Sequence, residues 1–285
     1  MAKKLLAQAE AATSADAGAF VLLRLARDIA AQASNGETAL AAVDAMSERY
    51  QIDALEMKAE MLYKCAKKAR TPPQHLSVAE QAARLLDEAT AAGNYAQAVK
   101  LVKLAVAEGG LSRSKEIVLW AKACLPDLQK KAKLATEFEA AQSTLAADPN
   151  DPVANLTAGT YYGYLQGDWA KALPHLAKGT DANLQTLAQR ELASPSTDID
   201  AQVAVADAWW DAGQNAEGMK RLAILRHAGS WYAKAQTETL GGLGKVKVEK
   251  RLEELAKAER EANVAGPGTR VFVPFGKWFS LLPSP

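Results

Sequence analysis

The stretch that decides the fold is residues 152–178, which read PVANLTAGTYYGYLQGDWAKALPHLAK. A proline opens it at the favoured first position of a helix, and Asp151 or Asn150 can cap that helix. Small and larger apolar residues recur at helical spacing on both sides of Gly167-Asp168. The stretch therefore predicts two short antiparallel helices joined by a tight turn, over residues 152–166 and 168–178.

The composition of the whole chain points the same way. Its 285 residues are typical of one large or two modest domains. Ala and Leu, the strongest helix formers, number 60 and 34, whereas Val and Ile together number only 20. This scarcity of β-branched residues argues against a sandwich, a barrel or a large parallel sheet. We therefore predict an all-α protein.

Charge and reactive side chains exclude several classes of function. Lys and Arg number 34 and Asp and Glu 33, so the net charge of +1 gives no electrostatic reason to expect nucleic acid as a partner. Two Cys and three His are too few for a disulfide framework or a zinc cluster. No run approaches the roughly 18 apolar residues that span a bilayer. We expect no cofactor, no metal and no membrane insertion.

The clearest boundary in the chain is Asp148-Pro149-Asn150-Asp151-Pro152, where helix formers give way to turn residues. The amphipathic stretch before it suits a helix that joins two halves. We expect three regions: an N-terminal helical array with a long linking helix over 1–147, a C-terminal array over 148–264, and a tail over 265–285.

Glycines and prolines predict where individual helices end. Thr71-Pro72-Pro73 ends one helix, because proline cannot continue the hydrogen-bonding pattern. Gly109-Gly110 predicts a break, and Pro126 predicts a bend or a break in the long helix. The N-terminal residues are expected to form the first helix. Further helices are expected over residues 14–33, 37–50, 53–70, 77–92, 95–108, 112–147, 181–193, 199–213, 216–239 and 243–263.

The helix pairs resemble tetratricopeptide repeats, in which small residues let two antiparallel helices approach and a Gly-Asp or Gly-Asn turn with an aromatic residue joins them. One copy contains Gly159, Tyr162 and Gly167-Asp168-Trp169, with one extra residue before the turn. Gly93-Asn94-Tyr95 resembles the turn of another copy. The resemblance implies a tetratricopeptide-like array of antiparallel helix pairs, an α-solenoid. Looser matches include Ala206, Trp209, Ala228, Tyr232 and Ala235, and Asn35-Gly36 with Ala39, Ala42 and Met46.

Longer stretches look like a helical module of large multidomain proteins from planctomycete-type bacteria. In such proteins the module typically precedes a β-rich domain of the sugar-binding or sulfatase-modifying-factor type, and the whole is exported or membrane-anchored. The resemblance implies a spacer or interaction platform in an extracytoplasmic or cell-envelope location, although the N-terminus lacks the apolar core of a signal peptide. It implies no catalytic residues. The stretches are FVLLR at 20–24, ALPHLAKG at 172–179, VADAWWD at 205–211, WYAKA at 231–235 and KVKVEKRL at 245–252.

Aromatic residues gather in the C-terminal array, where eight of the 18 lie within residues 161–232. Adjacent residues on a helix point about 100° apart, so both members of an aromatic pair cannot easily face one core. Ordinary packing between helices accounts for part of the cluster, and the rest is expected to line a surface for a protein partner, a second copy of the chain or a glycan. The candidate interaction surface comprises Tyr161, Tyr164, Trp169, Trp210 and Trp231.

Motifs for chemistry are weak. The sequence GGLGK at 241–245 falls short of a phosphate-binding loop, because Thr239 replaces the first glycine and Val246 follows the lysine. We interpret it as a turn that ends one helix and starts the next. Cys65 and Cys124 lie on Ala-rich helical faces and are interpreted as small buried apolar residues, with a disulfide as the alternative.

The tail from Val271 to Leu282 carries two Val, three Phe, one Trp and two Leu, and Lys277 is its single charge. Its proline and glycine exclude a further helical repeat. We expect it to dock in extended form on its own array, on a second copy or on a partner. The docking residues are expected to be Phe272, Phe275, Trp278 and Phe279.

These observations predict a non-enzymatic module for protein-protein interaction or structural scaffolding. The alternative is an accessory region, a spacer or a carbohydrate-associated segment, of a multidomain extracytoplasmic enzyme whose catalytic domain is absent from this sequence.

Overall fold

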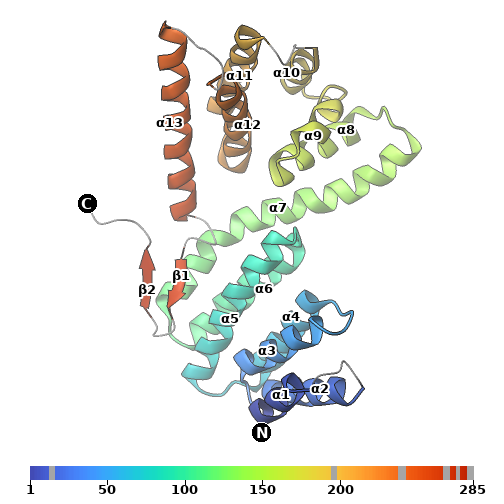
Figure 1. Cartoon of the computed structure of the whole chain (residues 1–285), viewed down its shortest axis with the longest axis vertical. Coiled ribbons are helices and arrows are strands. Elements are labelled where there is room, and N and C mark those ends of the chain that lie inside the picture. The colour runs from blue at the N-terminus through green and yellow to red at the C-terminus, as the bar shows by residue number, and fades with distance from the viewer. Residues whose placement is uncertain (13–16, 194–197, 237–241, 266–269, 274–276, 281–285) are drawn as a thin grey trace. The chain divides into compact units, whose positions relative to one another are not determined.

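A computed structural model describes residues 1–12, 17–193, 198–236, 242–265, 270–273 and 277–280, with side chains described up to residue 261. The described residues form thirteen α-helices, one π-helical segment and two short strands (Figure 1). The prediction of a helical protein is confirmed, whereas the repeat array stays a prediction. The helices are α1 (Ala2–Glu10), α2 (Ala17–Gln32), α3 (Gly36–Ser47), α4 (Ala54–Lys68), α5 (Pro72–Ala91), α6 (Tyr95–Leu111), α7 (Lys115–Ala147), α8 (Pro152–Thr160), the π-helical segment (Tyr161–Gln166), α9 (Trp169–Leu176), α10 (Ala182–Ala193), α11 (Ile199–Gln214), α12 (Gly218–Gln236) and α13 (Gly242–Ala265).

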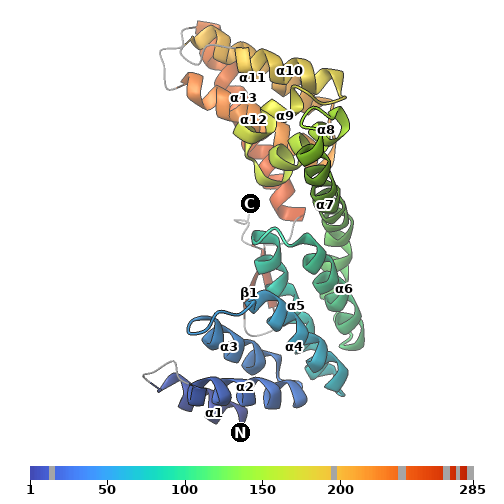
Figure 2. The ribbon, with the colours of Figure 1, turned by 90° about the vertical axis from the view of Figure 1, so that its right-hand side faces the viewer.

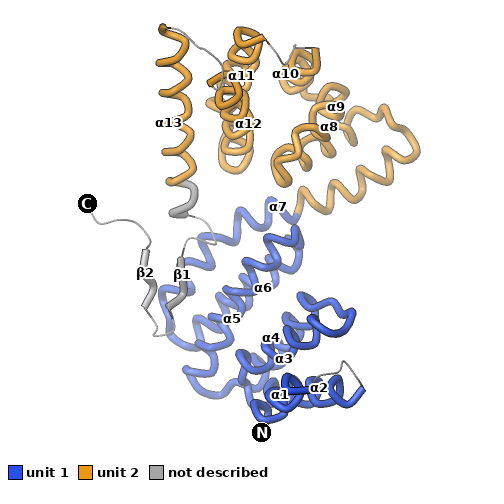
Figure 3. Tube along the Cα trace, in the orientation of Figure 1, with its two compact units in different colours: residues 1–132, 266–285 blue, residues 133–265 orange. Residues whose placement is uncertain are grey.

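The chain divides into two compact units, and the division falls within α7 (Figure 3). Unit 1 comprises residues 1–132 together with 266–285, and unit 2 comprises residues 133–265. The first part of α7 therefore belongs to unit 1 and its second part to unit 2. The proline-rich boundary at 148–152 coincides with the end of α7 and the start of α8.

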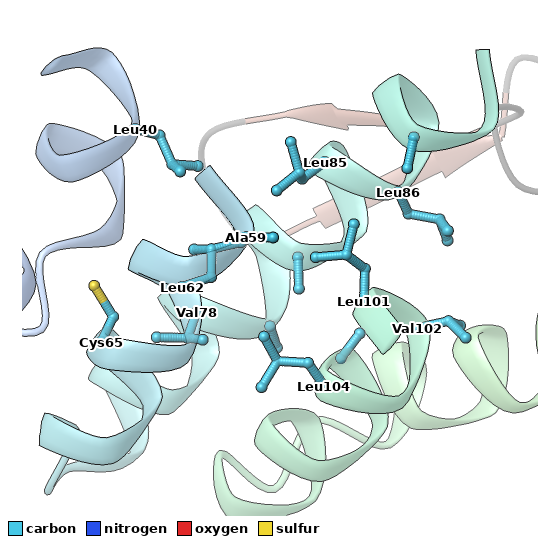
Figure 4. Close-up of a cluster of buried hydrophobic side chains, with 14 of the residues drawn as sticks. Leu40, Ala59, Leu62, Cys65, Val78, Leu85, Leu86, Leu101, Val102 and Leu104 are labelled. Carbon is cyan, nitrogen blue, oxygen red and sulfur yellow. The ribbon is translucent and has the colours of Figure 1, made fainter. Parts of the chain in front are cut away.

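Unit 1 contains antiparallel helix pairs, of which α5 and α6 are the clearest. Gly93 joins them with a backbone φ of 71°, a conformation that favours glycine. Asn94 then caps α6 by accepting a hydrogen bond from the main-chain N–H of Gln97. Figure 4 shows the core that these helices form with their neighbours. Its side chains at most 1% exposed include Leu62, Val78, Leu85, Leu86, Leu101 and Val102.

One buried charge ties three helices of unit 1 together. Lys58 of α4 is 7% exposed, and its Nζ forms ion pairs with Asp44 of α3 and, at 2.7 Å, with Glu88 of α5. Burial acts to lower the pKa of Lys58, but the hydrogen bonds to the two carboxylates outweigh it and the pKa is raised. The lysine is therefore held in its charged form.

At three places the structure differs from the sequence prediction. The prolines after Thr71 do follow α4, but they also open α5, five residues earlier than expected, because the first helical position needs no N–H donor. Gly109-Gly110 does not break α6, which continues to Leu111. A Cβ on Gly109 would lie 3.2 Å from Ile117, so this glycine allows α7 to approach. Of the bend or break predicted at Pro126, the break is wrong, because α7 runs without interruption from 115 to 147.

Unit 2 packs α8, the π-helical segment and α9 beside α10, and α11 against α12 (Figures 1 and 2). Gly159 of α8 lies so close to α9 that a Cβ there would be 2.6 Å from Leu176 Cδ2. This is the close approach of helices that the small residues predicted. The core is centred on three large side chains at most 1% exposed, Trp209, Trp210 and Tyr232.

The C-terminal tail is described only in part. Residues 270–273 and 277–280 form strands β1 and β2, which pair antiparallel with Phe272 opposite Trp278 and Val271 opposite Phe279. Phe275 lies outside the described residues, as do the side chains of the whole tail. The docking of this segment stays a prediction.

Candidate functional site

A cavity of about 770 Å³ opens in unit 2 between the π-helical segment, α9 and α12. This volume is in the range of pockets that hold small ligands or large side chains. Its aromatic lining is Tyr164, Trp169 and Trp231, its polar lining is Gln166, Glu191, Arg226, His227, Ser230 and Lys234, and its aliphatic lining includes Leu165, Ala170, Leu173 and Ala223.

One wall of the cavity is a single stripe of α12. Residues 223, 226, 227, 230, 231 and 234 line the cavity, and their spacing of three or four places them on one helix face. Another face of α12 carries Ala228, Tyr232 and Ala235, which are fully buried. The helix therefore presents one side to the core and another to the cavity.

The opposite wall is the π-helical segment, Tyr161–Gln166. A π-helix accommodates an extra residue and changes the direction of the side chains that follow, and such turns are frequent at functional sites. The segment ends at Gly167, which has a left-handed φ of 67°. Asp168 then caps α9 by accepting a hydrogen bond from the main-chain N–H of Lys171. The extra residue before this turn is thus contained in the π-helical segment.

Glu191 of α10 joins three side chains from two other helices. It is 7% exposed, and its Oε2 accepts hydrogen bonds from Trp209 Nε1 at 2.6 Å and His227 Nε2 at 2.8 Å. Its Oε1 accepts from Trp231 Nε1 at 2.9 Å. A carboxylate only accepts, so His227 carries a proton on Nε2. The Glu191 cluster, defined by these four residues, uses both carboxylate oxygens and connects α10, α11 and α12.

Trp169 covers part of this cluster. Its ring stacks on His227 with centroids 3.9 Å apart and planes 12° from parallel. The same ring meets Trp209 edge to face, at 5.2 Å and 67°. Both are arrangements that aromatic rings prefer. The cavity wall is therefore built from interlocked rings with few rotatable bonds, so little side-chain freedom remains to be lost when a ligand binds.

Tyr164 brings an unsatisfied polar group to the wall. Its hydroxyl is buried and has no hydrogen-bond partner within the described part of the chain. Burial raises the pKa of Tyr164, and the negative charge of Asp181 raises it further. The hydroxyl is therefore neutral at physiological pH and keeps its proton to donate.

Two cationic side chains of the lining, Arg226 and Lys234, lie where the cavity opens to solvent. The Arg226 side chain is 52% exposed, and its Nε donates to Glu259 Oε1 of α13 at 2.8 Å. Lys234 is exposed, and its Nζ lies 4.9 Å from the centroid of the Trp231 ring. Both contacts are surface interactions of modest strength. An incoming anion can therefore compete with the Glu259 carboxylate for Arg226 at little cost.

The cavity brings together three of the five aromatic residues predicted from the sequence. Tyr164, Trp169 and Trp231 line it. Tyr161 instead stacks on Phe138 of α7, with centroids 3.9 Å apart. The prediction for Trp210 is wrong, because this residue is 1% exposed and belongs to the core. Both members of an adjacent aromatic pair can be buried when other helices cover both of the directions in which they point.

Neither Glu191 nor His227 was singled out from the sequence. An isolated glutamate in a helix carries no motif, and its three donors come from residues 18 to 40 positions away. One signal was present: Trp209, His227 and Trp231 each bring a ring N–H into an apolar region. Buried ring N–H groups usually need an acceptor, so an acceptor near these three rings was to be expected.

The cavity also contains a serine, a histidine and a carboxylate, the residue types of a hydrolytic triad. A triad requires the serine hydroxyl to hydrogen-bond to the imidazole. Here Ser230 Oγ donates to the main-chain oxygen of His227 at 2.7 Å, while His227 Nε2 donates to Glu191. The arrangement is therefore that of a hydrogen-bonded wall and not of a nucleophile with its base.

Other reactive side chains are accounted for by packing. Cys65 and Cys124 are buried thiols that form no disulfide, and burial raises the pKa of Cys65 to about 11. They behave as the apolar residues that we predicted, and not as a disulfide. Within the described ranges, no group of three or more His, Cys, Asp or Glu side chains could hold a metal, and no helix is long and apolar enough to cross a bilayer.

Comparison with known proteins gives no further guide. No protein-family model, curated protein or solved structure matches the chain. The cavity and its chemistry therefore carry the functional argument.

Proposed function

We propose that the chain is a non-enzymatic interaction module that binds a segment of a partner protein in the cavity of unit 2. One observation carries the proposal: a cavity with rigid aromatic walls and exposed cations lies between helices of unit 2. Tryptophan, tyrosine and arginine are the residues that contribute most binding energy at protein interfaces. The tetratricopeptide-like sequence pattern supports the same function.

The hydrogen bonding of the polar residues supports binding over catalysis. Glu191 already accepts three hydrogen bonds and is not available as a base. His227 donates to Glu191 through Nε2 and lies under the Trp169 ring. These interactions hold the wall in place, which is what a preformed binding surface requires.

The second candidate is an accessory region of a multidomain extracytoplasmic enzyme, with glycan contact through the aromatic residues. It rests on the resemblance to the planctomycete-type module and on the tryptophans of the cavity. A sugar ring stacks on tryptophan but also needs acceptors for its hydroxyl groups. The carboxylate that lines the cavity is already engaged by three donors and is therefore not available to a sugar hydroxyl, which favours a peptide.

The proposal is tested by selecting binders from a random peptide library displayed on phage, with the whole chain as bait. Ala170 is exposed and lines the cavity, so Ala170→Trp fills its mouth without disturbing the core. Ala182→Trp, at an exposed position of α10 outside the cavity, is the matched control.

We expect selected peptides to bind the unmodified chain and Ala182→Trp, and to lose binding to Ala170→Trp. Peptides that bind all three proteins equally, or no enrichment at all, would contradict a peptide-binding function for the cavity. Enrichment of the chain on a glycan array, lost in Ala170→Trp, would favour the second candidate.

A further inference from the structure

The polar groups at the cavity mouth are matched to a ligand that accepts hydrogen bonds. Arg226 and Lys234 carry positive charge at exposed positions. The carboxylate in the lining, Glu191, has both oxygens occupied by donors. The Tyr164 hydroxyl adds a proton without a partner. The two cations and the Tyr164 proton are therefore complementary to carboxylates.

The spacing of the two cations sets the spacing of their partners. Arg226 and Lys234 are eight residues apart on α12, so at 1.5 Å per residue their Cα atoms are separated by about 12 Å along the helix axis. An extended peptide advances about 3.3 Å per residue, so side chains four residues apart are separated by about 13 Å. Two carboxylates at positions i and i+4 of an extended segment therefore match the two cations.

The residue between these carboxylates meets the aromatic wall. In an extended segment the side chains at i, i+2 and i+4 point to the same side. Trp231 lies on the α12 stripe between the two cations, and Trp169 lines the same cavity. A bulky apolar side chain at i+2 would enter between these rings while its acidic neighbours reach the mouth.

From this placement we propose that the cavity binds an extended acidic peptide in which a bulky apolar residue lies between two carboxylates four positions apart. The inference rests on the proposed function and specifies its ligand. The incoming carboxylate takes the place of Glu259 on Arg226. This exchange distinguishes the proposal from a general attraction of acidic peptides to a basic surface, because it makes Glu259 a competitor of the ligand.

The test uses fluorescence polarisation with the whole chain and a dye-labelled peptide amide of sequence Gly-Glu-Ala-Phe-Ala-Glu-Gly. Two control peptides replace both glutamates by glutamines or the phenylalanine by glycine. The protein variants are Arg226→Gln, Lys234→Gln and Glu259→Gln. The matched control is Lys220→Gln, an exposed position of α12 outside the cavity. Circular dichroism confirms that every variant keeps its helix content.

We expect both control peptides to bind at least tenfold more weakly than the parent peptide. Arg226→Gln and Lys234→Gln should each weaken binding about threefold to tenfold, and Lys220→Gln should leave it unchanged. Glu259→Gln should strengthen binding about twofold to fivefold, because it removes the competing carboxylate.

Three results would overturn the inference: equal binding of the glutamine peptide, equal weakening by Lys220→Gln, or no binding of the parent peptide at 1 mM. These results are distinguishable from failure of the proposed function. If library peptides lose binding to Ala170→Trp but carry no acidic pair, the proposed binding function stands and the acidic ligand is wrong. Absence of any cavity-dependent peptide removes both.

Discussion

Replacing Glu191 by alanine should strongly destabilise unit 2. The change leaves Trp209 Nε1 and His227 Nε2 buried without an acceptor, whereas the half-buried Trp231 can turn to water. Each unsatisfied buried donor costs about 1–3 kcal/mol. The free energy of unfolding should therefore fall by about 3–5 kcal/mol, the range seen when a buried charge partner is removed.

Glu191→Gln provides a graded version of the same perturbation. With its amide oxygen in the place of Oε2, glutamine still accepts from Trp209 and His227. Its NH₂ group then faces the indole N–H of Trp231, so one of the three bonds is lost. We expect a loss of about 1–2 kcal/mol, smaller than for alanine.

Urea unfolding followed by tryptophan fluorescence measures both changes, because four of the six tryptophans lie in unit 2. Glu139→Ala, at an exposed position of α7 in the same unit, is the matched control and should change stability by less than about 0.5 kcal/mol. If Glu191→Ala and Glu139→Ala unfold at the same urea concentration, the Glu191 cluster does not hold the three helices together.

Four further outcomes are expected. Lys58→Met should lower the free energy of unfolding by about 1–3 kcal/mol at pH 7. Because the pKa of Lys58 in the folded chain is raised above 10.5, the difference in this free energy between Lys58→Met and the unmodified chain, measured by urea unfolding, should vanish as pH rises through that pKa. The pKa of His175 is lowered, first by burial and then by the positive charge of Lys178, so the melting temperature should fall as pH drops below about 6.5. If the melting temperature of His175→Gln falls by the same amount over this pH range, the prediction is wrong. Gly159→Ala should cost about 1–3 kcal/mol by calorimetry because its Cβ meets α9, whereas Gly110→Ala, with open space around it, should be neutral or slightly stabilising. Deleting residues 270–285 should lower the melting temperature or change the mass in solution by light scattering, and no change in either would show that the tail does not dock.

The helices were predictable because their signals are local. Ala and Leu periodicity, the cap Asp151, and the turns at Gly93 and Gly167 depend on neighbouring residues, and the structure confirms them. The errors at Pro72 and Gly109 have a common cause. Each residue type can end a helix but is also accepted in one: Pro72 at the first helical position, which needs no N–H donor, and Gly109 where Ile117 of α7 packs closely.

The candidate site was predictable only in part, for the same reason. Trp169 and Trp231 were marked by their type and by their place beside a turn or in a pair of aromatic residues. Glu191 is one of 33 acidic residues and has no local feature that sets it apart. Its importance comes from three donors on two other helices, and this convergence exists only after the chain has folded.

The π-helical segment makes the cavity dependent on the length of the chain as well as on its composition. Deleting Tyr161 or Tyr162, which do not line the cavity, would restore ordinary α-helical geometry and turn the side chains that follow by about 100°. Tyr164 would then leave the wall although no lining residue had been substituted. A single insertion or deletion event is therefore enough to create or abolish this cavity, and homologous chains with the same helices are expected to differ in whether they have it.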